Sequence, residues 1–216
     1  MSALKLVTDR TEADCIYLEE LNAKGWANMT EEERFFWRCG EPEVLELLDG
    51  TLETSDGLIV GAGGGVVRGG YNTDDMNRVE AAVQTVAAQA LALLDEIAAY
   101  LVEKGVAPDT VFVLPYTAQN TQVEPQRVWL SSEMPDDDDC AAYLAQVQRI
   151  KDILATDAPA VPADMVDFRV GEANDIEKIL LSVESALLKL QTQTKDRIDR
   201  TAEGWLYSGE FYAGEV

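Results

Sequence analysis

Residues 73–105 read TDDMNRVEAAVQTVAAQALALLDEIAAYLVEKG, and this stretch decides the fold. Its apolar residues recur at steps of three and four, the helical period: Met76, Val79, Val83, Val86, Ala90, Leu94, Ile97 and Leu101. Thr73 suits the N-cap, and the pattern continues through about Glu103 to Gly105. A helix of about 45 Å would nearly span a compact domain whose radius of gyration is about 17 Å. We therefore expect an elongated body or a helix bundle.

A second long helix is predicted from about Glu172 to Arg200. Its apolar positions alternate steps of four and three, which is typical of a coiled-coil or bundle seam. An ordinary core-facing helix explains the same pattern equally well over barely three heptads. The predicted packing seam consists of Ile176, Leu180, Val183, Leu187 and Leu190, within a long-helix bundle that covers 73–204.

The residues between the two long helices predict a short strand, a loop and a third amphipathic helix. Val111 to Leu114 favours a strand, and the polar residues to Arg127 favour a loop. Four aspartates at 136–139 precede a helical pattern. They fit a helix N-terminus better than a calcium site, because the central Gly and distant Glu of an EF-hand loop are missing. The Pro-punctuated segment 158–168 predicts a stiff linker to the last helix.

The first fifty residues predict a head of three short helices. Thr11 with Asp14 forms an acidic capping box and opens a helix that Gly25 closes, with Cys15 and Ile16 among the residues of its apolar side. Thr30 with Glu33 opens a second helix, to Gly40, and Pro42 a third, to Gly50.

Residues 51–72 are rich in glycine with short apolar pairs, and they predict a small β-hairpin or a flexible insert. They do not form a nucleotide-binding loop, because Val66 occupies the closing position of GxGxxG and no GK[ST] follows. The fold class is therefore mainly α: a short-helix head (1–50), a hairpin insert (51–72), a long-helix bundle (73–204) and an extended aromatic tail (205–216).

The tail repeats a short aromatic unit, YSGEF followed directly by YAGEV. A segment this short cannot bury its own rings, so it must dock on a protein surface. That surface belongs to this chain, to a neighbouring copy or to another protein. The predicted partner-docking residues are Trp205, Tyr207, Phe211 and Tyr212.

The charge balance excludes two classes of partner. The chain carries 40 acidic and 17 basic residues, a net charge of -23. Binding to phosphate backbones or anionic membranes needs clustered Lys and Arg, so we expect neither nucleic acid nor membrane. The acidic surface fits solubility, a basic partner or bound cations.

The sequence offers no catalytic constellation. It contains no histidine, the commonest general base and metal ligand, and its three cysteines are far apart without a CxxC spacing. No nucleophile elbow occurs. We predict no enzymatic activity, no catalytic residues, no cofactor and no metal ligands.

Four stretches together resemble a module of structural proteins in temperate phages of gut Gram-positive bacteria. They are GWANMT (25–30) with the Glu31–Glu33 run after it, GYNTDDMNRV (70–79), EANDIEKILL (172–181) and YSGE (207–210). In that group the module occurs in tail and baseplate-region proteins. The present chain departs from the pattern at 51–69, which looks like an insert between blocks that usually lie closer together.

The resemblance implies a virion component, made in the host cytoplasm and built into a tail or baseplate. Its partners would be other phage structural proteins and copies of itself, and it brings no catalytic residues. Two alternatives stay open: a head decoration or head-fibre protein, and a module that binds a receptor or a host protein.

Overall fold

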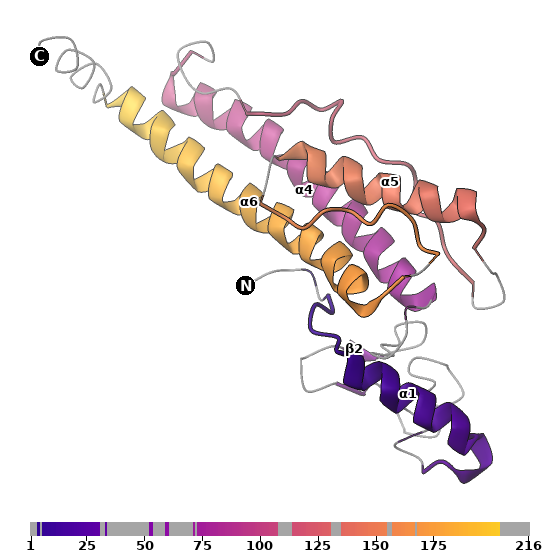
Figure 1. Ribbon diagram of the computed structural model, residues 1–216. Helices are drawn as coiled ribbons and strands as arrows, with labels where there is room; N and C mark the ends of the chain where they lie inside the picture. The colour runs from indigo at the N-terminus through magenta and orange to yellow at the C-terminus, as the bar shows by residue number, and fades with distance from the viewer. Residues whose placement is uncertain are drawn as a thin grey trace, which may run out of the picture.

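A computed structural model describes residues 4, 6–30, 33, 52–53, 59–60, 71, 73–107, 114–130, 135–154, 157–166 and 168–203. In chain order its elements are α1 (Glu12–Lys24), the 3-10 turn η1 (Trp26–Asn28), β1 (Leu52–Glu53), β2 (Ile59–Val60), α4 (Thr73–Lys104), α5 (Asp137–Ile153) and α6 (Val170–Ala202). The protein is mainly helical and its long helices form a bundle, as the sequence predicts (Figure 1).

The two longest helices, α4 and α6, run side by side in the same direction (Figure 1). Near their first turns, Arg78 Nη2 lies 2.8 Å from Glu177 Oε1. Further along, Tyr100 Oη donates to Asp199 Oδ1 at 2.8 Å. α4 has about the length predicted for it, and α6 extends two residues beyond its predicted range at each end. At about 1.5 Å per residue each helix is about 50 Å long.

An extended segment returns the chain from the end of α4 to the start of α5. It runs antiparallel to α4, because Tyr116 Oη donates to Ala90 O at 3.1 Å whereas Trp129 N donates to Asn77 Oδ1 at 2.7 Å. A second return, through 157–166, leads to α6 (Figure 1). All three bundle helices are therefore parallel, a topology that the sequence pattern does not reveal. The predicted strand at 111–114 lies outside the described residues except Leu114, which is buried and is not in a strand.

The core lies between α4, α5 and α6. The apolar stripe predicted on α4 is buried along its length, with Leu94 half-buried. Of the predicted seam, Ile176, Leu180, Val183 and Leu187 are buried and Leu190 is half-buried against the same core. These side chains therefore pack within this chain.

Helices α1 and α5 begin where the sequence predicts, each at a capping box formed by a pair of polar side chains. Thr11 and Asp14 form a reciprocal capping box at α1, and Gly25 ends that helix with φ +75°. Asp136 and Asp139 form a second box at α5. Two of the four aspartates at 136–139 thus serve as a helix cap, as predicted.

Replacing Asp136 with alanine is expected to lower the free energy of unfolding by about 0.5–2 kcal/mol, the usual effect of losing an N-cap side chain. The physical reason is that the amide of Asp139 loses its acceptor. Urea unfolding followed by circular dichroism measures the loss. Asp138→Ala, in the same first turn but outside the box, is the control. Equal losses for the two variants would contradict the capping role.

The head of short helices is described only in part. α1 forms as predicted and Cys15 is half-buried, but Ile16 is 56% exposed, so the predicted apolar side is wrong at Ile16. Thr30 Oγ1 accepts from the Glu33 amide at 3.2 Å, while the helices predicted to Gly40 and Gly50 lie outside the described residues.

The insert and the tail are mostly outside the described residues. In the insert, β1 pairs antiparallel with β2, with Leu52 opposite Val60. The rest of the predicted hairpin, and the tail from residue 204 onward, are not among the described residues.

Helix α4 is also long and apolar enough, by length and composition, to cross a membrane, with a mean hydropathy of 1.5. A core helix of a globular domain meets the same criterion. Here α4 packs against α5 and α6.

Candidate functional site

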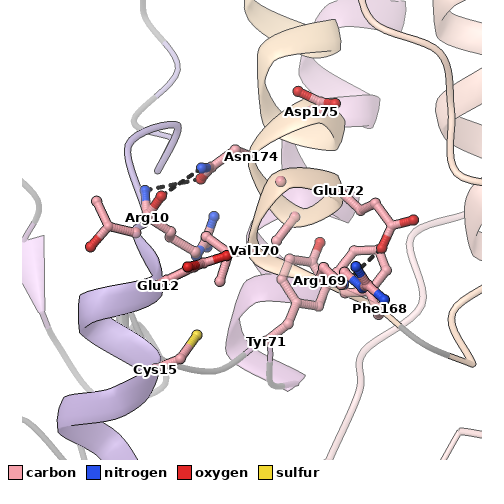
Figure 2. A pocket seen from close by; sticks show the side chains of 13 residues that line it. Arg10, Glu12, Cys15, Tyr71, Phe168, Arg169, Val170, Glu172, Asn174 and Asp175 are labelled. Atoms are coloured by element: carbon pink, nitrogen blue, oxygen red, sulfur yellow. Dashed lines mark hydrogen bonds between the residues drawn. The ribbon is translucent and has the colours of Figure 1, made fainter.

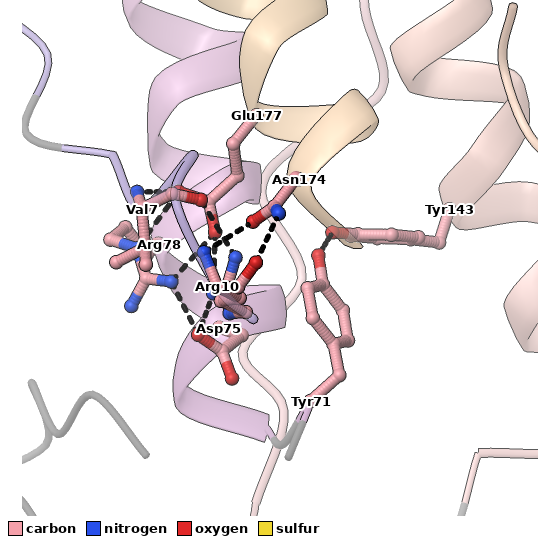
Figure 3. A network of polar contacts seen from close by, with 8 residues as sticks. All are labelled: Val7, Arg10, Tyr71, Asp75, Arg78, Tyr143, Asn174 and Glu177. Carbon is pink, nitrogen blue, oxygen red and sulfur yellow. Dashed lines mark hydrogen bonds and ion pairs between the residues drawn. The ribbon is translucent and has the colours of Figure 1, made fainter. Parts of the chain in front are cut away.

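The N-terminal segment is held against the first turns of α4 and α6 by a buried polar network (Figure 3). Arg10 Nη2 lies 2.7 Å from both Asp75 Oδ1 and Glu177 Oε1, and Arg10 Nη1 donates to Val7 O at 2.7 Å. Glu177 also accepts from the Val7 amide. Asn174 binds the Arg10 backbone twice, accepting from its amide at 3.0 Å and donating to its carbonyl at 2.9 Å. Three segments that are far apart in sequence are thus fixed together by one set of side chains. We call this set the clamp: Arg10, Asp75, Arg78, Asn174 and Glu177.

The charges of the clamp balance. Arg78 contacts Asp75 and lies 2.8 Å from Glu177 Oε1, so two guanidinium groups meet two carboxylates. The Asp75 and Glu177 side chains are fully buried. Burial lowers the pKa of Arg78, but Asp75 and Glu177 together raise it above its ordinary value. Arg78 therefore stays charged, and the clamp is a fixed structural unit.

Two tyrosines continue the network towards α5. The hydroxyls of Tyr71 and Tyr143 share a hydrogen bond, and burial raises the pKa of each above its ordinary value. The Tyr71 ring lies 4.9 Å from Phe168, and the Arg10 guanidinium lies 5.6 Å from the Tyr71 ring centre. These phenols are neutral at physiological pH and act as packing and hydrogen-bonding groups.

The sequence contains a signal for this network that periodicity misses. Asp75 lies one residue before Met76 of the α4 stripe, and Glu177 lies one residue after Ile176 of the predicted seam. A charged residue on the margin of an apolar stripe is buried only when it is paired. Arg10 has no such signal.

A groove of about 740 Å³ opens beside the clamp, between the start of α1 and the start of α6 (Figure 2). Tyr71, Phe168 and Val170 are among its apolar lining, and Glu12 and Glu172 are among its polar lining. The groove is therefore an apolar surface with an acidic margin, suited to an amphipathic ligand.

Cys15 also lines this groove. Burial raises the pKa of the Cys15 thiol, and the carboxylates of Asp14, Glu19 and Glu12 raise it further. The thiol is thus protonated at neutral pH and is a poor nucleophile.

A third buried carboxylate, Glu80 on α4, lies apart from the clamp. It is 4% exposed, and its Oε2 has no hydrogen-bond partner in the described part of the chain. Burial raises the pKa of Glu80 above 4.5, and the neighbouring Arg127 and Trp129 lower it by a smaller amount. Ionised Glu80 therefore destabilises the fold.

Glu80→Gln is expected to raise the melting temperature at pH 7.5. The folded pKa of Glu80 lies above the unfolded value, so its favourable contribution is complete below about pH 4.5 and is lost as the pH rises through the folded value. The gain from glutamine should therefore be smaller at pH 4.5 than at pH 7.5, as scanning calorimetry can measure. A constant difference between the two pH values would contradict this origin.

The sequence-predicted site residues lie in different places. The seam residues Ile176, Leu180, Val183 and Leu187 are in the core, Leu190 lies at its edge, and the docking residues Trp205, Tyr207, Phe211 and Tyr212 lie outside the described residues. Within the described part of the chain, no group of three Cys, Asp or Glu side chains is arranged to hold a metal ion. Asp139 instead contacts Arg127, which lowers the pKa of the carboxyl.

Comparison of the chain with protein-family models, with curated proteins and with solved structures finds no match.

Proposed function

We propose that this protein is a non-catalytic structural component of a phage virion, assembled into the tail or baseplate. The observation that carries the proposal is a rod of parallel helices, about 50 Å long by the rise of an α-helix, whose two ends differ. At one end the clamp fixes the N-terminal segment, and from the other the chain continues beyond α6 into the predicted docking tail. A rigid body with one docking segment is what a particle subunit needs.

The clamp supports a structural role more than a chemical one. Its four charged side chains bind one another and the Val7 backbone, so their charge is used within the fold. The reason for proposing a phage particle is the resemblance of the sequence to phage structural proteins. The acidic surface suits assembly beside basic neighbours.

Peptide mass spectrometry on gradient-purified particles tests the proposal, with copy number calibrated against the major capsid and tail-tube proteins. A low count near a small multiple of three or six fits a tail tip or baseplate. Hundreds of copies would favour the alternative of a head decoration or head-fibre protein. If the protein is absent from the particles but abundant in the lysate, the virion proposal is wrong.

The predicted docking residues have a direct test. Particles assembled with the Tyr207→Ala, Tyr212→Ala double variant are expected to lack the protein, while circular dichroism of the purified variant keeps its helical signal. Each buried ring contributes roughly 1.5–3 kcal/mol, so loss of two should prevent docking. Unchanged incorporation would remove the docking role of the tail.

The second alternative is a receptor-binding module, in which the insert would contact the receptor. Deleting residues 51–69 should abolish adsorption but not assembly if the insert contacts a receptor. Normal adsorption of the deletion variant would argue against this alternative.

A further inference from the structure

We infer that the groove between α1 and α6 receives the aromatic tail of a second copy of this chain. The inference rests on the proposed docking role of the tail and names its partner. The tail unit carries Tyr207, Phe211 and Tyr212 within six residues. Three observations support the match: the chemistry of the groove, a buried group without a partner among the described residues, and the reach of the chain.

The groove has the surface that a tyrosine-rich segment needs. The rings of Phe168 and Tyr71 pack against each other, with centroids 4.9 Å apart and planes tilted by 60°, and both line the groove beside Val170 (Figure 2). An incoming aromatic ring gains from stacking on such faces as well as from burial. The margin carries the carboxylates of Glu12 and Asp175, which accept a tyrosine hydroxyl hydrogen bond. An apolar ring with a polar tip fits both parts of the surface.

One of the residues that line the groove, Arg10, also carries a buried donor without a partner among the described residues. This donor is Nε, whereas both terminal nitrogens of Arg10 are paired. A buried donor without an acceptor is unfavourable by about 1–3 kcal/mol. The tail supplies acceptors in its tyrosine hydroxyls and in Glu210.

The reach of the chain requires that the tail come from another copy. The groove is at the first turn of α6, and the tail begins after the last turn of that helix. Val170 and Ala202 are separated by about 48 Å of helix. Tyr212 follows Ala202 by ten positions, which span at most about 33–36 Å when fully extended. The rings of a chain therefore fall short of Phe168 and Val170 in its own groove, whereas those of a neighbour are not limited in this way.

A tail that docks in the groove of a neighbour makes a head-to-tail contact. Such a contact leaves one free groove and one free tail at each step, so it forms rings or filaments unless two copies exchange tails. Packing many copies in one particle raises the effective concentration of each tail, so a weak single contact is sufficient.

Two variants damage the two halves of the contact separately. Tyr207→Ala with Tyr212→Ala removes the tail rings. Gly171→Trp fills the groove, and the position is open because a Cβ there meets no atom of the described residues within 4 Å. Ala145→Trp, at an exposed position on α5, is the matched control for a new surface tryptophan. Circular dichroism and the melting temperature verify that each variant is folded.

Sedimentation velocity over a range of concentrations then measures self-association. Wild type and Ala145→Trp should associate equally. The tail variant and the groove variant should each need a protein concentration at least about thirtyfold higher than wild type to associate to the same extent. This is the effect of losing a hot-spot aromatic. A mixture of the two should form a 1:1 dimer, because one supplies an intact groove and the other an intact tail.

The outcomes separate this inference from the proposed function. A mixture that stays monomeric, or wild type that never associates, overturns docking between copies. If the protein is nonetheless found in purified particles, the virion proposal stands and the tail binds a different partner. If the protein associates as expected but is absent from particles, the inference stands and the virion proposal fails.

Discussion

Replacing Glu177 with alanine is expected to lower the free energy of unfolding by about 3–5 kcal/mol, the usual effect of removing one partner from a buried ion pair. Glu177 is fully buried and accepts from Arg10, Arg78 and the Val7 amide. Without it, two guanidinium groups face Asp75 alone, and the N-terminal segment loses a contact to α6. Guanidinium chloride unfolding followed by tryptophan fluorescence measures the loss.

Two further variants separate charge from volume and position. Glu177→Gln keeps the volume of the side chain and removes its charge. We expect it to lower the free energy of unfolding by most of the amount expected for Glu177→Ala. Asp196 is exposed on the same helix. Asp196→Ala should therefore change stability by less than about 0.5 kcal/mol, as surface substitutions usually do. A loss for Glu177→Ala no larger than the loss for Asp196→Ala would mean that the clamp does not stabilise the fold.

Leu180→Ala is expected to lower the free energy of unfolding by about 2–5 kcal/mol, the range for deleting a buried leucine side chain. Leu180 is 0% exposed, whereas Leu188 on the same helix is 53% exposed. Leu188→Ala is therefore a control matched in residue type and in helix, and it should lower the free energy of unfolding by much less. Urea unfolding at two protein concentrations measures both losses.

The concentration series also decides where the predicted seam acts. If Leu180 packs within one chain, its loss is independent of protein concentration. A loss that shrinks as the protein concentration rises would instead place Leu180 at a contact between copies.

The sequence predicts the helices well because their signals are local. Periodicity gives the stripe of α4, and the capping boxes at Thr11 and Asp136 place the starts of α1 and α5. The positive φ of Gly25 and Gly105 follows the glycine stop signals at the ends of α1 and α4. Each of these features depends on residues that are close neighbours in the sequence.

The clamp and the helix directions could not be predicted in this way. Arg10 meets Glu177 across 167 positions, and no local pattern specifies such a pair. The parallel arrangement depends on two extended returns, and the sequence predicts only a loop for the first and a stiff linker for the second. The prediction for Ile16 is wrong because hydrophobicity alone does not show which face of a short helix is covered.

The separation of Arg10 from Glu177 also affects the order of events during synthesis. The two residues are 167 positions apart. A ribosome that adds about 5–20 residues per second needs about 8–33 s to cover that distance. Until α6 has emerged, the guanidinium of Arg10 lacks one of its two carboxylates and the Val7 amide lacks its acceptor.

Native closure of the N-terminal segment therefore waits for α6. A chain truncated before α6 cannot complete it, because Asn174 and Glu177 are then missing. A correctly folded groove thus marks a chain that has been translated into α6.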